Sequence, residues 1–336
     1  MNIGIIGVGR IGKVHTESIS KYVKDVKIKS VYNFIWDDAT VEWANSMGLT
    51  ERCDDYHQIL QDPDIDAVLI CTSTDTHAKI SLEAIEANKH IFCEKPVDHD
   101  IKQIIAVKNA LDGKNIKYQV GFNRRFDANY RAIRVAIEDD KVGKIYLMTI
   151  TSRDPAPPSI DYIKVSGGLY LDMAIHDFDM VRYLSGEEVV EVYAAGSVLI
   201  DKAIGAEGDI DTSIVTLKLA SGALAVIDNS RKSVYGYDQR AEVFGSKGSV
   251  MIGNNTKSSI VMSNDSGVTK EKPLHFFLER YMLAYAEEIQ AFIHAVKSDT
   301  PTPVTITDGL NAVIIAKAAQ LSYRENRPVA LQEIMP

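Results

Sequence analysis

Runs of apolar residues alternate with amphipathic stretches through the first third of the chain. The continuous apolar run at residues 67–71 is typical of a parallel strand that is covered on both faces. On this pattern we predict strands over residues 3–6, 26–32, 67–71, 90–93 and 118–121, and helices over residues 14–22, 39–47, 77–87 and 101–111. Strands that alternate with helices over short connections predict a doubly wound parallel sheet, of the Rossmann type, over residues 1–121.

The pattern changes after Gly121, where apolar and polar residues alternate as they do in half-buried antiparallel strands. We predict strands over residues 145–152, 189–199, 213–219, 223–229, 239–244 and 249–252, and helices over residues 129–138, 171–184, 277–296 and 308–323. Residues 122–336 should therefore form a second, α+β domain with an open, mostly antiparallel sheet. Helices would cover one face of this sheet, and an identical subunit is the obvious cover for the other.

A glycine-rich loop joins the first predicted strand to the first predicted helix. Gly7, Gly9 and Gly12 form a G-x-G-x-x-G pattern at this junction. The first glycine allows a tight turn, the second lets a pyrophosphate approach the backbone, and the third lets the helix pack on the strand. The free N–H groups at the start of the helix then face the phosphates. Glycine-rich turns also occur for purely structural reasons, but the strand before and the helix after this one favour a dinucleotide site.

The end of the second strand bears on the choice of cofactor. In this fold a residue about 20 positions beyond the loop meets the adenosine ribose. Asn33 stands there and can hydrogen-bond the ribose hydroxyls, although it does not repel a 2′-phosphate. Asp37 and Asp38 follow and add negative charge, and residues 33–38 contain no Arg or Lys. The sequence favours NAD without excluding NADP.

Composition narrows the class of protein. A chain of 336 residues with 46% hydrophobic residues suits two domains, and a net charge of −9 argues against nucleic-acid or anionic-membrane partners. The sequence has neither an apolar run long enough for a membrane span nor the pattern of a signal peptide. Cys53, Cys71 and Cys93 have no disulfide or zinc spacing, so we expect reduced thiols in a cytoplasmic protein.

Two further segments carry candidate chemistry, and the first is Glu94-Lys95-Pro96. It follows the strand at residues 90–93, and open α/β sheets bind ligands at the carboxyl ends of their strands. A lysine there can donate to a reacting hydroxyl and stabilise a developing alkoxide. A surface turn with a solvated lysine is the alternative interpretation.

The second segment contains Asp172, His176 and Asp179, at positions i, i+4 and i+7 of the helix predicted over residues 171–184. Such spacing places all three side chains on one face. A histidine oriented by a carboxylate is a ready proton acceptor near neutral pH. The alternatives are a partly buried histidine satisfied by a neighbouring acid, and a metal site. We expect no metal, because the sequence offers no further ligand cluster.

Taken together, these motifs resemble the Gfo/Idh/MocA oxidoreductases, and within them most closely the inositol 2-dehydrogenases. The glycine loop and Glu94-Lys95-Pro96 are family-wide, whereas residues 121–127 (GFNRRFD) and 235–238 (YGYD) indicate inositol enzymes more narrowly. Asn33 departs from the pattern, since many relatives carry Asp there.

The resemblance implies that Lys95, Asp172 and His176 are the catalytic set. His176 would accept the hydroxyl proton, Lys95 would stabilise the same oxygen, and Asp172 would position the substrate or the lysine. The implied cofactor contacts are Gly7, Gly9, Arg10, Ile11, Gly12, Asn33, Thr72, Ser73, His77, Glu94 and Lys95. The implied substrate contacts are Lys95, Asn123, Arg124, Asp172, His176, Asp179 and Tyr235. Structural alternatives exist for some of these residues: a helix N-cap for Ser73, a solvated turn for Arg124 and sheet-face packing for Tyr235.

Three functions remain open on the sequence. The first is NAD-dependent oxidation of a cyclitol, most simply of myo-inositol to 2-keto-myo-inositol (scyllo-inosose), by a homotetramer built through the second-domain sheet. The second is oxidation of scyllo-inositol, a hexose or a deoxy-sugar by the same residues. The third is a non-catalytic dinucleotide-binding regulator, which would be expected to lack Lys95 or His176; both are present.

Overall fold

The computed structural model describes residues 1–335, which group into two compact units. The first unit comprises Met1–Phe126 and Met282–Val313, and the second comprises Asp127–Tyr281 and residues 314–335. The first unit is therefore not one continuous segment ending at residue 121. The reason lies in its core, because Ile289, Phe292 and Ile293 pack in one hydrophobic cluster with residues of the N-terminal sheet.

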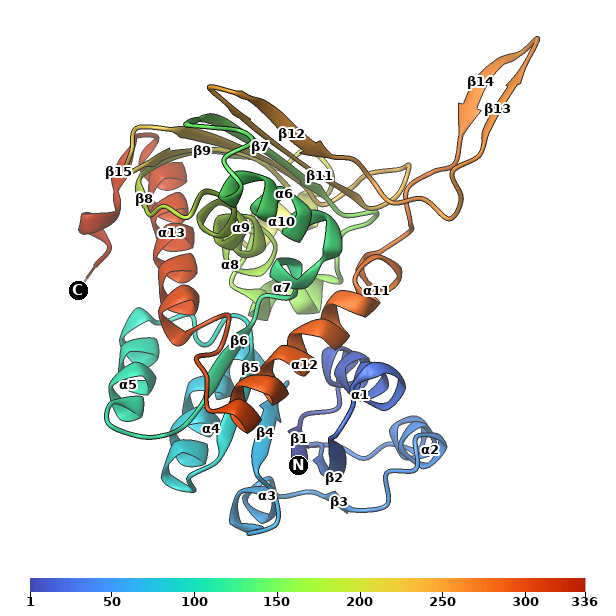
Figure 1. Cartoon of the computed structure of the whole chain (residues 1–336), viewed down its shortest axis with the longest axis vertical. Coiled ribbons are helices and arrows are strands. Elements are labelled where there is room, and N and C mark those ends of the chain that lie inside the picture. Colours follow the sequence, from blue (N-terminus) through green and yellow to red (C-terminus); the bar gives the residue numbers. More distant parts are fainter. Residues whose placement is uncertain (336) are drawn as a thin grey trace. The chain divides into compact units, whose positions relative to one another are not determined.

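Within the described residues, the first unit contains a six-stranded parallel sheet in the order β3-β2-β1-β4-β5-β6 (Figure 1). Its strands are β1 (Asn2–Ile6), β2 (Lys27–Tyr32), β3 (Arg52–Cys53), β4 (Ala67–Ile70), β5 (His90–Glu94) and β6 (Tyr118–Gly121). Its helices are α1 (Arg10–Tyr22), α2 (Asp38–Ser46), α3 (His57–Gln61), α4 (Thr74–Glu86), α5 (Ile101–Leu111), the 3₁₀ turn Asn123–Phe126, and α12 (Met282–Ser298). The predicted doubly wound parallel sheet is confirmed.

The strand order fixes where this unit can bind a ligand. The order reverses direction between β1 and β4, and a crevice opens at the carboxyl ends of the strands at such a switch point. Gly7 follows β1, Thr72 and Ser73 follow β4, and Glu94 is the last residue of β5. The topology therefore gathers the predicted cofactor residues along one edge of the sheet.

The second unit contains a mixed, mostly antiparallel sheet of seven strands in the described residues, in the order β12-β11-β7-β10-β9-β8-β15. These are β7 (Ile145–Arg153), β8 (Val189–Ser197), β9 (Thr212–Leu219), β10 (Leu224–Ser230), β11 (Asp238–Gly245), β12 (Gly248–Ile252) and β15 (Val329–Ala330). Its helices are α6 (Ala128–Glu138), α7 (Ile160–Ser166), α8 (Leu169–Asp172), α9 (Ile175–Ser185), α10 (Lys202–Ala206), α11 (Phe277–Arg280) and the 3₁₀ turn Leu331–Glu333. Helix α13 (Ile306–Glu325) begins in the first unit and ends in the second.

Two helices expected from the sequence are each divided in the structure. The helix expected over residues 277–296 is α11 and α12, separated at Tyr281, whose buried ring packs against Arg280 and Tyr237. The helix expected over residues 171–184 is α8 and α9, separated at Met173 and Ala174. Asp172 therefore ends one short helix, while His176 and Asp179 lie on the next, so the single helix predicted for all three is two helices.

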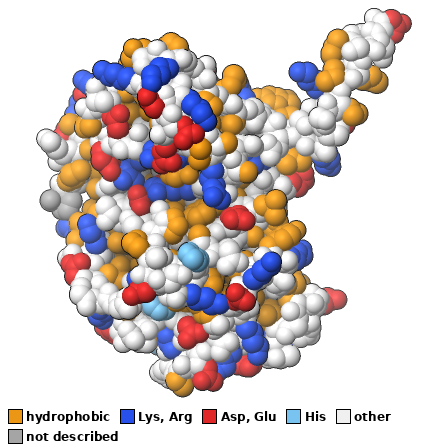
Figure 2. Space-filling view, in the orientation of Figure 1, with side chains coloured by type: hydrophobic (Ala, Val, Ile, Leu, Met, Phe, Trp, Pro, Cys, Tyr) orange, Lys and Arg blue, Asp and Glu red, His pale blue; other side chains and the backbone are white. Residues whose placement is uncertain are grey.

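A two-stranded hairpin, β13 (Val261–Asn264) and β14 (Gly267–Lys270), was not expected from the sequence. It projects away from the seven-stranded sheet of its own unit (Figure 1). Hydrophobic side chains lie along this arm in the space-filling view (Figure 2), and Ile260, Met262 and Val268 are all well exposed. No helix within residues 1–335 has the length and apolar character needed to cross a membrane.

Candidate active site

The glycine loop has the geometry that a pyrophosphate requires. Gly7 has φ +99°, and a Cβ there would lie 2.8 Å from the Thr72 backbone nitrogen. A Cβ on Gly12 would lie 1.9 Å from the Gly7 carbonyl oxygen, so helix α1 packs on β1 at van der Waals distance only because this residue has no side chain. Gly9 is the N-cap of α1, and a Cβ there would meet nothing within 4 Å. The loop thus leaves open space beside Gly9, where a dinucleotide would approach the helix N-terminus.

The remaining predicted cofactor residues of this loop and of β2 lie close by in the same unit. Arg10 and Ile11 open helix α1; Arg10 is exposed and Ile11 is half-buried. Asn33 follows β2, and its side-chain oxygen accepts from the Val8 N–H at 3.2 Å while its amide nitrogen donates to the Ile35 carbonyl at 2.6 Å. Asn33 is thereby fixed against the glycine loop, which is where a ribose contact is expected.

The segment after β4 holds the next group. Ser73 is the N-cap of α4, although its hydroxyl makes no capping hydrogen bond, and Thr72 Oγ1 lies 2.6 Å from Thr76 Oγ1. The buried His77 ring reaches two carbonyl oxygens, with Nδ1 2.8 Å from Pro96 O and Nε2 3.0 Å from Thr72 O. Burial disfavours the charged ring, but Cys93 and these two carbonyls outweigh it and raise the pKa of His77 to about 9. His77 therefore ties the segment after β4 to the Lys95–Pro96 turn.

Glu94 is held from two sides at the end of β5. Its Oε1 lies 2.7 Å from His15 Nε2, and its Oε2 accepts from the Lys95 backbone N–H at 3.1 Å. His15 and Glu94 are 0% and 6% exposed, whereas Lys95 itself is half-buried. The pair fixes the backbone from which the lysine side chain extends.

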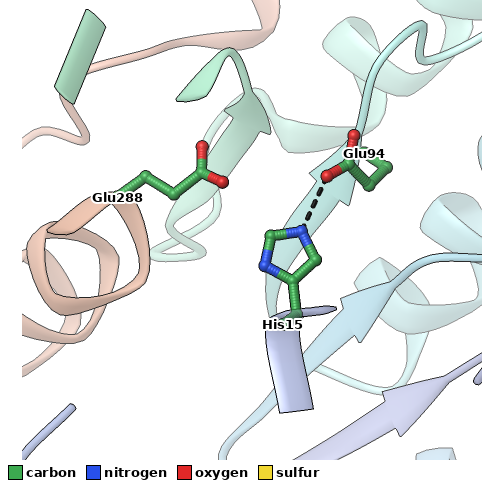
Figure 3. A group of neighbouring side chains, drawn as sticks. All are labelled: His15, Glu94 and Glu288. Atoms are coloured by element: carbon green, nitrogen blue, oxygen red, sulfur yellow. Dashed lines mark hydrogen bonds and ion pairs between the residues drawn. The ribbon is translucent and has the colours of Figure 1, made fainter. Parts of the chain in front are cut away.

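Glu288 of α12 points toward this pair (Figure 3). Both of its carboxyl oxygens are buried without a hydrogen-bond partner in the described structure. Burial, and to a lesser degree the Glu94 charge, raise the pKa of Glu288 well above its usual value. One ligand atom from each of His15, Glu94 and Glu288 lies within 4.8 Å of the others, so the three could also hold a metal ion. The sequence analysis missed this cluster, since Glu288 is far from the other two residues along the chain.

Asn123 and Arg124 follow β6 in the short turn Asn123–Phe126. They are 2% and 4% exposed, so the solvated turn considered for Arg124 is wrong. The Asn123 side-chain nitrogen has no hydrogen-bond partner among the described residues, which leaves a buried donor for a ligand or water to satisfy.

In the second unit, the turn before α8 places Asp172. Gly168 has φ +85°, and a Cβ on it would lie 2.8 Å from Asp209 Oδ1, so only glycine fits there. Asp209 Oδ1 accepts from the Leu169 N–H at 2.9 Å, at the start of α8. At the end of α8 the Asp172 carboxyl accepts from the Tyr162 hydroxyl at 2.8 Å and from Arg231 Nη1 at 3.1 Å.

Helix α9 carries His176 and Asp179. Asp172 and His176 are half-buried, whereas Ile175, Asp177 and Asp179 are buried. The side chains of Asp172 and His176 are thus the accessible ones in this segment. Asp177 accepts from the Asn229 amide at 2.8 Å and anchors α9 to β10.

Tyr235 belongs to a different polar group of the second unit. Its hydroxyl donates to Asp238 Oδ2 at 2.6 Å and accepts from Arg153 Nη1 at 3.2 Å. It borders an open pocket of about 570 Å³ at the base of the β13–β14 hairpin. Among the described residues, the walls of this pocket do not include Asp172, His176 or Asp179.

Arg231, Tyr162, His15 and Glu288 are the residues around these sites that the sequence analysis did not assign. His15 had one usable signal, because it lies three residues after Gly12 on the face of α1 that must pack on the sheet. Arg231 had none, since its partners Asp172 and Asp209 are 59 and 22 residues away.

Comparisons with known proteins agree with the geometry. Residues 1–122 match the model of an oxidoreductase family with an NAD-binding Rossmann fold, and residues 130–251 match the GFO/IDH/MocA C-terminal domain. The chain is 45% identical over 335 residues to the myo-inositol 2-dehydrogenase of Thermotoga maritima, covering 100% of each chain. It is 46% identical to the inositol 2-dehydrogenase of Rhizobium meliloti, covering 98% of this chain and 99% of the relative.

A solved structure is also similar. The scyllo-inositol dehydrogenase of Lactobacillus casei, with bound NAD(H) and scyllo-inositol, superposes with a TM-score of 0.92 at 30% identity, covering 99% of each chain. The resemblance seen in the sequence is confirmed: the chain belongs to the Gfo/Idh/MocA family of oxidoreductases, with an NAD-binding Rossmann domain.

Proposed function

We propose that this protein oxidises myo-inositol at its C2 hydroxyl to 2-keto-myo-inositol (scyllo-inosose), with NAD as the hydride acceptor. The proposal is carried by Lys95, directly after β5, together with the accessible Asp172 and His176, in a chain that is similar over its full length to two inositol 2-dehydrogenases. The open space beside Gly9 and the exposed helix N-terminus fit the pyrophosphate of NAD. When bound, NAD supplies the electrophilic ring carbon that receives the hydride.

Side chains of the protein would accept the proton, stabilise the developing charge and position the substrate. His176 accepts the proton of the C2 hydroxyl as the carbon–hydrogen bond breaks. Lys95 donates a hydrogen bond to the same oxygen and stabilises its developing negative charge. Asp172 accepts from a substrate hydroxyl or from the lysine. The products are the ketone, NADH and one proton, so atoms and electrons balance.

The substrate pocket must distinguish the orientations of ring hydroxyls. Asn123, Arg124 and Asp179 are buried polar residues suited to fork onto or accept from hydroxyls of a neutral ring. Tyr235 would reach substrate only if its hydroxyl exchanged a protein partner, because Arg153 and Asp238 already occupy it. The proposal therefore includes Tyr235 as a substrate contact that forms after this exchange.

A second candidate is oxidation of scyllo-inositol, which the similar Lactobacillus casei enzyme's name favours. Both inositols give the same ketone, because they differ only in the orientation of the C2 hydroxyl. The reverse reaction distinguishes the two candidate functions, because it shows which inositol is formed from the shared ketone. We would supply purified protein with scyllo-inosose and NADH and identify the inositol formed by NMR. We expect myo-inositol; formation of scyllo-inositol alone would favour the second candidate, and no NADH consumption would contradict both.

We also propose that the chain assembles as a homotetramer through the outer face of the second-unit sheet. Leu224, Leu147 and Phe244 lie opposite one another across β10, β7 and β11, and their side chains are 44%, 40% and 47% exposed. Three apolar residues in register form a patch of the kind that a second copy covers. The cytoplasmic location expected from the sequence stays a prediction.

A further inference from the structure

We propose that Arg231 is a positioning residue for Asp172, holding its carboxylate as a fixed negative charge so that His176 alone exchanges the substrate proton. The inference rests on the proposed function and adds to it two residues, Arg231 and Tyr162, that neither the sequence analysis nor the comparisons assign.

The first support is the burial of the arginine. Its side chain is 1% exposed, and the residue follows β10 in the second unit. Nη1 donates to Asp172 Oδ2 at 3.1 Å, and Nη2 donates to Asp209 Oδ2 at 3.5 Å. A buried guanidinium without carboxylate partners would be strongly destabilising, so Arg231 and these two acids form one unit.

The second support is the geometry on the other oxygen. Asp172 Oδ1 accepts from the Tyr162 hydroxyl at 2.8 Å, so a donor occupies each carboxyl oxygen. The Asp172 side chain is nevertheless 13% exposed, which leaves lone pairs accessible to a substrate hydroxyl. Charge-assisted hydrogen bonds favour the ionised form of a carboxyl group. Asp172 is therefore a good hydrogen-bond acceptor and a poor proton acceptor.

The third support is the place of Asp209. It accepts from the Leu169 N–H at the start of α8, while Asp172 is the last residue of that four-residue helix. Arg231 thus links the acid that holds the beginning of α8 with the acid at its end. Because so short a helix has little stability of its own, its orientation depends on such tertiary contacts.

The charged and titratable groups that the described contacts bring to Asp172 are Arg231 and Tyr162, with Asp209 behind the arginine and His176 one turn further along the chain. Loss of the guanidinium hydrogen bond to Asp172 Oδ2 would weaken the stabilisation of the ionised carboxylate and make protonation of Asp172 easier. An additional acidic limb in the pH dependence of the reaction is then expected.

The test compares Arg231→Lys with Arg182→Lys. Arg182 is a matched control, since it lies in the same unit, has a side chain 8% exposed, and forks onto Glu188 at 2.8 and 2.7 Å. Neither the proposed chemistry nor the proposed cofactor site involves it. Lysine keeps the charge but loses the fork that reaches two acids. We expect kcat to fall at least about tenfold in the Arg231 variant, with little change in the KM for NAD. We also expect the acidic limb of its kcat/KM profile to shift to higher pH.

Tyr162→Phe keeps the inference testable should Arg231→Lys fail to fold, because Tyr162 is 38% exposed and its hydroxyl is removed without a cavity. We expect a several-fold lower kcat and an acidic limb shifted in the same direction. Equal behaviour of the two lysine variants, or a Phe variant with unchanged kcat and pH profile, would overturn the inference. A wild-type protein without turnover on any inositol would instead contradict the proposed function.

Discussion

His15 Nε2 lies 2.7 Å from Glu94 Oε1 in the interior of the NAD-binding unit. The other oxygen of Glu94 accepts from the Lys95 backbone N–H, so one carboxylate joins helix α1 to the proposed catalytic lysine. This connection gives the sequence Glu94-Lys95 a physical meaning: the carboxylate of Glu94 holds the backbone of the lysine in place.

We predict that Glu94→Gln lowers kcat by roughly tenfold while the protein still folds. An amide has one oxygen and one NH2 donor, so if the glutamine oxygen accepts from the Lys95 N–H, only the NH2 group faces His15, and the charged acceptor is lost from both contacts. Steady-state kinetics with NAD and myo-inositol measure the effect. Asp55→Asn is the matched control, because Asp55 pairs with His57 at 2.6 Å on the exposed surface of the same unit. Indistinguishable kcat values for the two variants would contradict the role of Glu94 in holding the Lys95 backbone.

Glu288→Gln should stabilise the protein increasingly as the pH rises. The folded state holds the Glu288 pKa well above its unfolded value, so the unfolded state releases a proton that the folded state retains. The wild type therefore loses up to about 1.4 kcal/mol of stability per pH unit above the unfolded pKa, until the folded pKa is reached. The glutamine variant lacks this loss.

Urea unfolding of both proteins between about pH 5 and about pH 8 measures this difference. We expect the advantage of the variant to be smallest at the acidic end and to grow with pH. An advantage that does not depend on pH would contradict a neutral buried acid. If the cluster held a cation instead, treatment with EDTA would lower the melting temperature of the wild type, and we expect no such change.

Substitutions of the second and third glycines of the loop should have different effects, one on NAD binding and the other on stability. Gly9→Ala meets open space in the protein, so the melting temperature should change little, while NAD binding weakens because the methyl group occupies the pyrophosphate approach. Gly12→Ala places a Cβ 1.9 Å from the Gly7 carbonyl and should lower the melting temperature by several degrees. Calorimetric NAD titration and thermal melts measure both. The reverse ranking of the two melting temperatures would contradict the geometry of the loop.

The alternating pattern of the first unit explains why so much of it could be predicted from the sequence. Strands such as β4 are buried on both faces and therefore appear in the sequence as uninterrupted apolar runs. The glycine loop is likewise recognisable from neighbouring residues alone. The break between α8 and α9 had no local signal, because residues 171–184 keep a helical pattern throughout. Asp209 and Arg231, which contact the two ends of α8, reach it only in the folded chain.

The same limit applies to the site. The glycine loop could be predicted because its motif holds Gly7, Gly9 and Gly12 at a fixed spacing. Arg231 and Glu288 lie beside their neighbours only because the fold brings distant segments together, which no spacing encodes. The hairpin of β13 and β14 also lacked a signal, since its strands are exposed on both faces and show no alternation.

Leu147→Asp should dissociate the proposed assembly. It places a charge in the middle of the apolar row formed with Leu224 and Phe244, where a second copy would have to bury it. Light scattering should report a smaller particle than the wild type. Leu199→Asp is the control, because Leu199 is 73% exposed in the loop after β8, and its variant should keep the wild-type mass. An unchanged mass for the Leu147 variant would contradict an interface on this face.

The central claim is hydride transfer from C2 of myo-inositol, and myo-inositol deuterated at C2 tests it most directly. The protein would be incubated with this substrate and NAD, and the NADH would be analysed by mass spectrometry, with His176→Ala in parallel. We predict that the NADH carries the deuterium, that turnover is slower than with unlabelled substrate, and that the variant forms little NADH. NADH without deuterium, or no NADH from the wild type, would contradict the account.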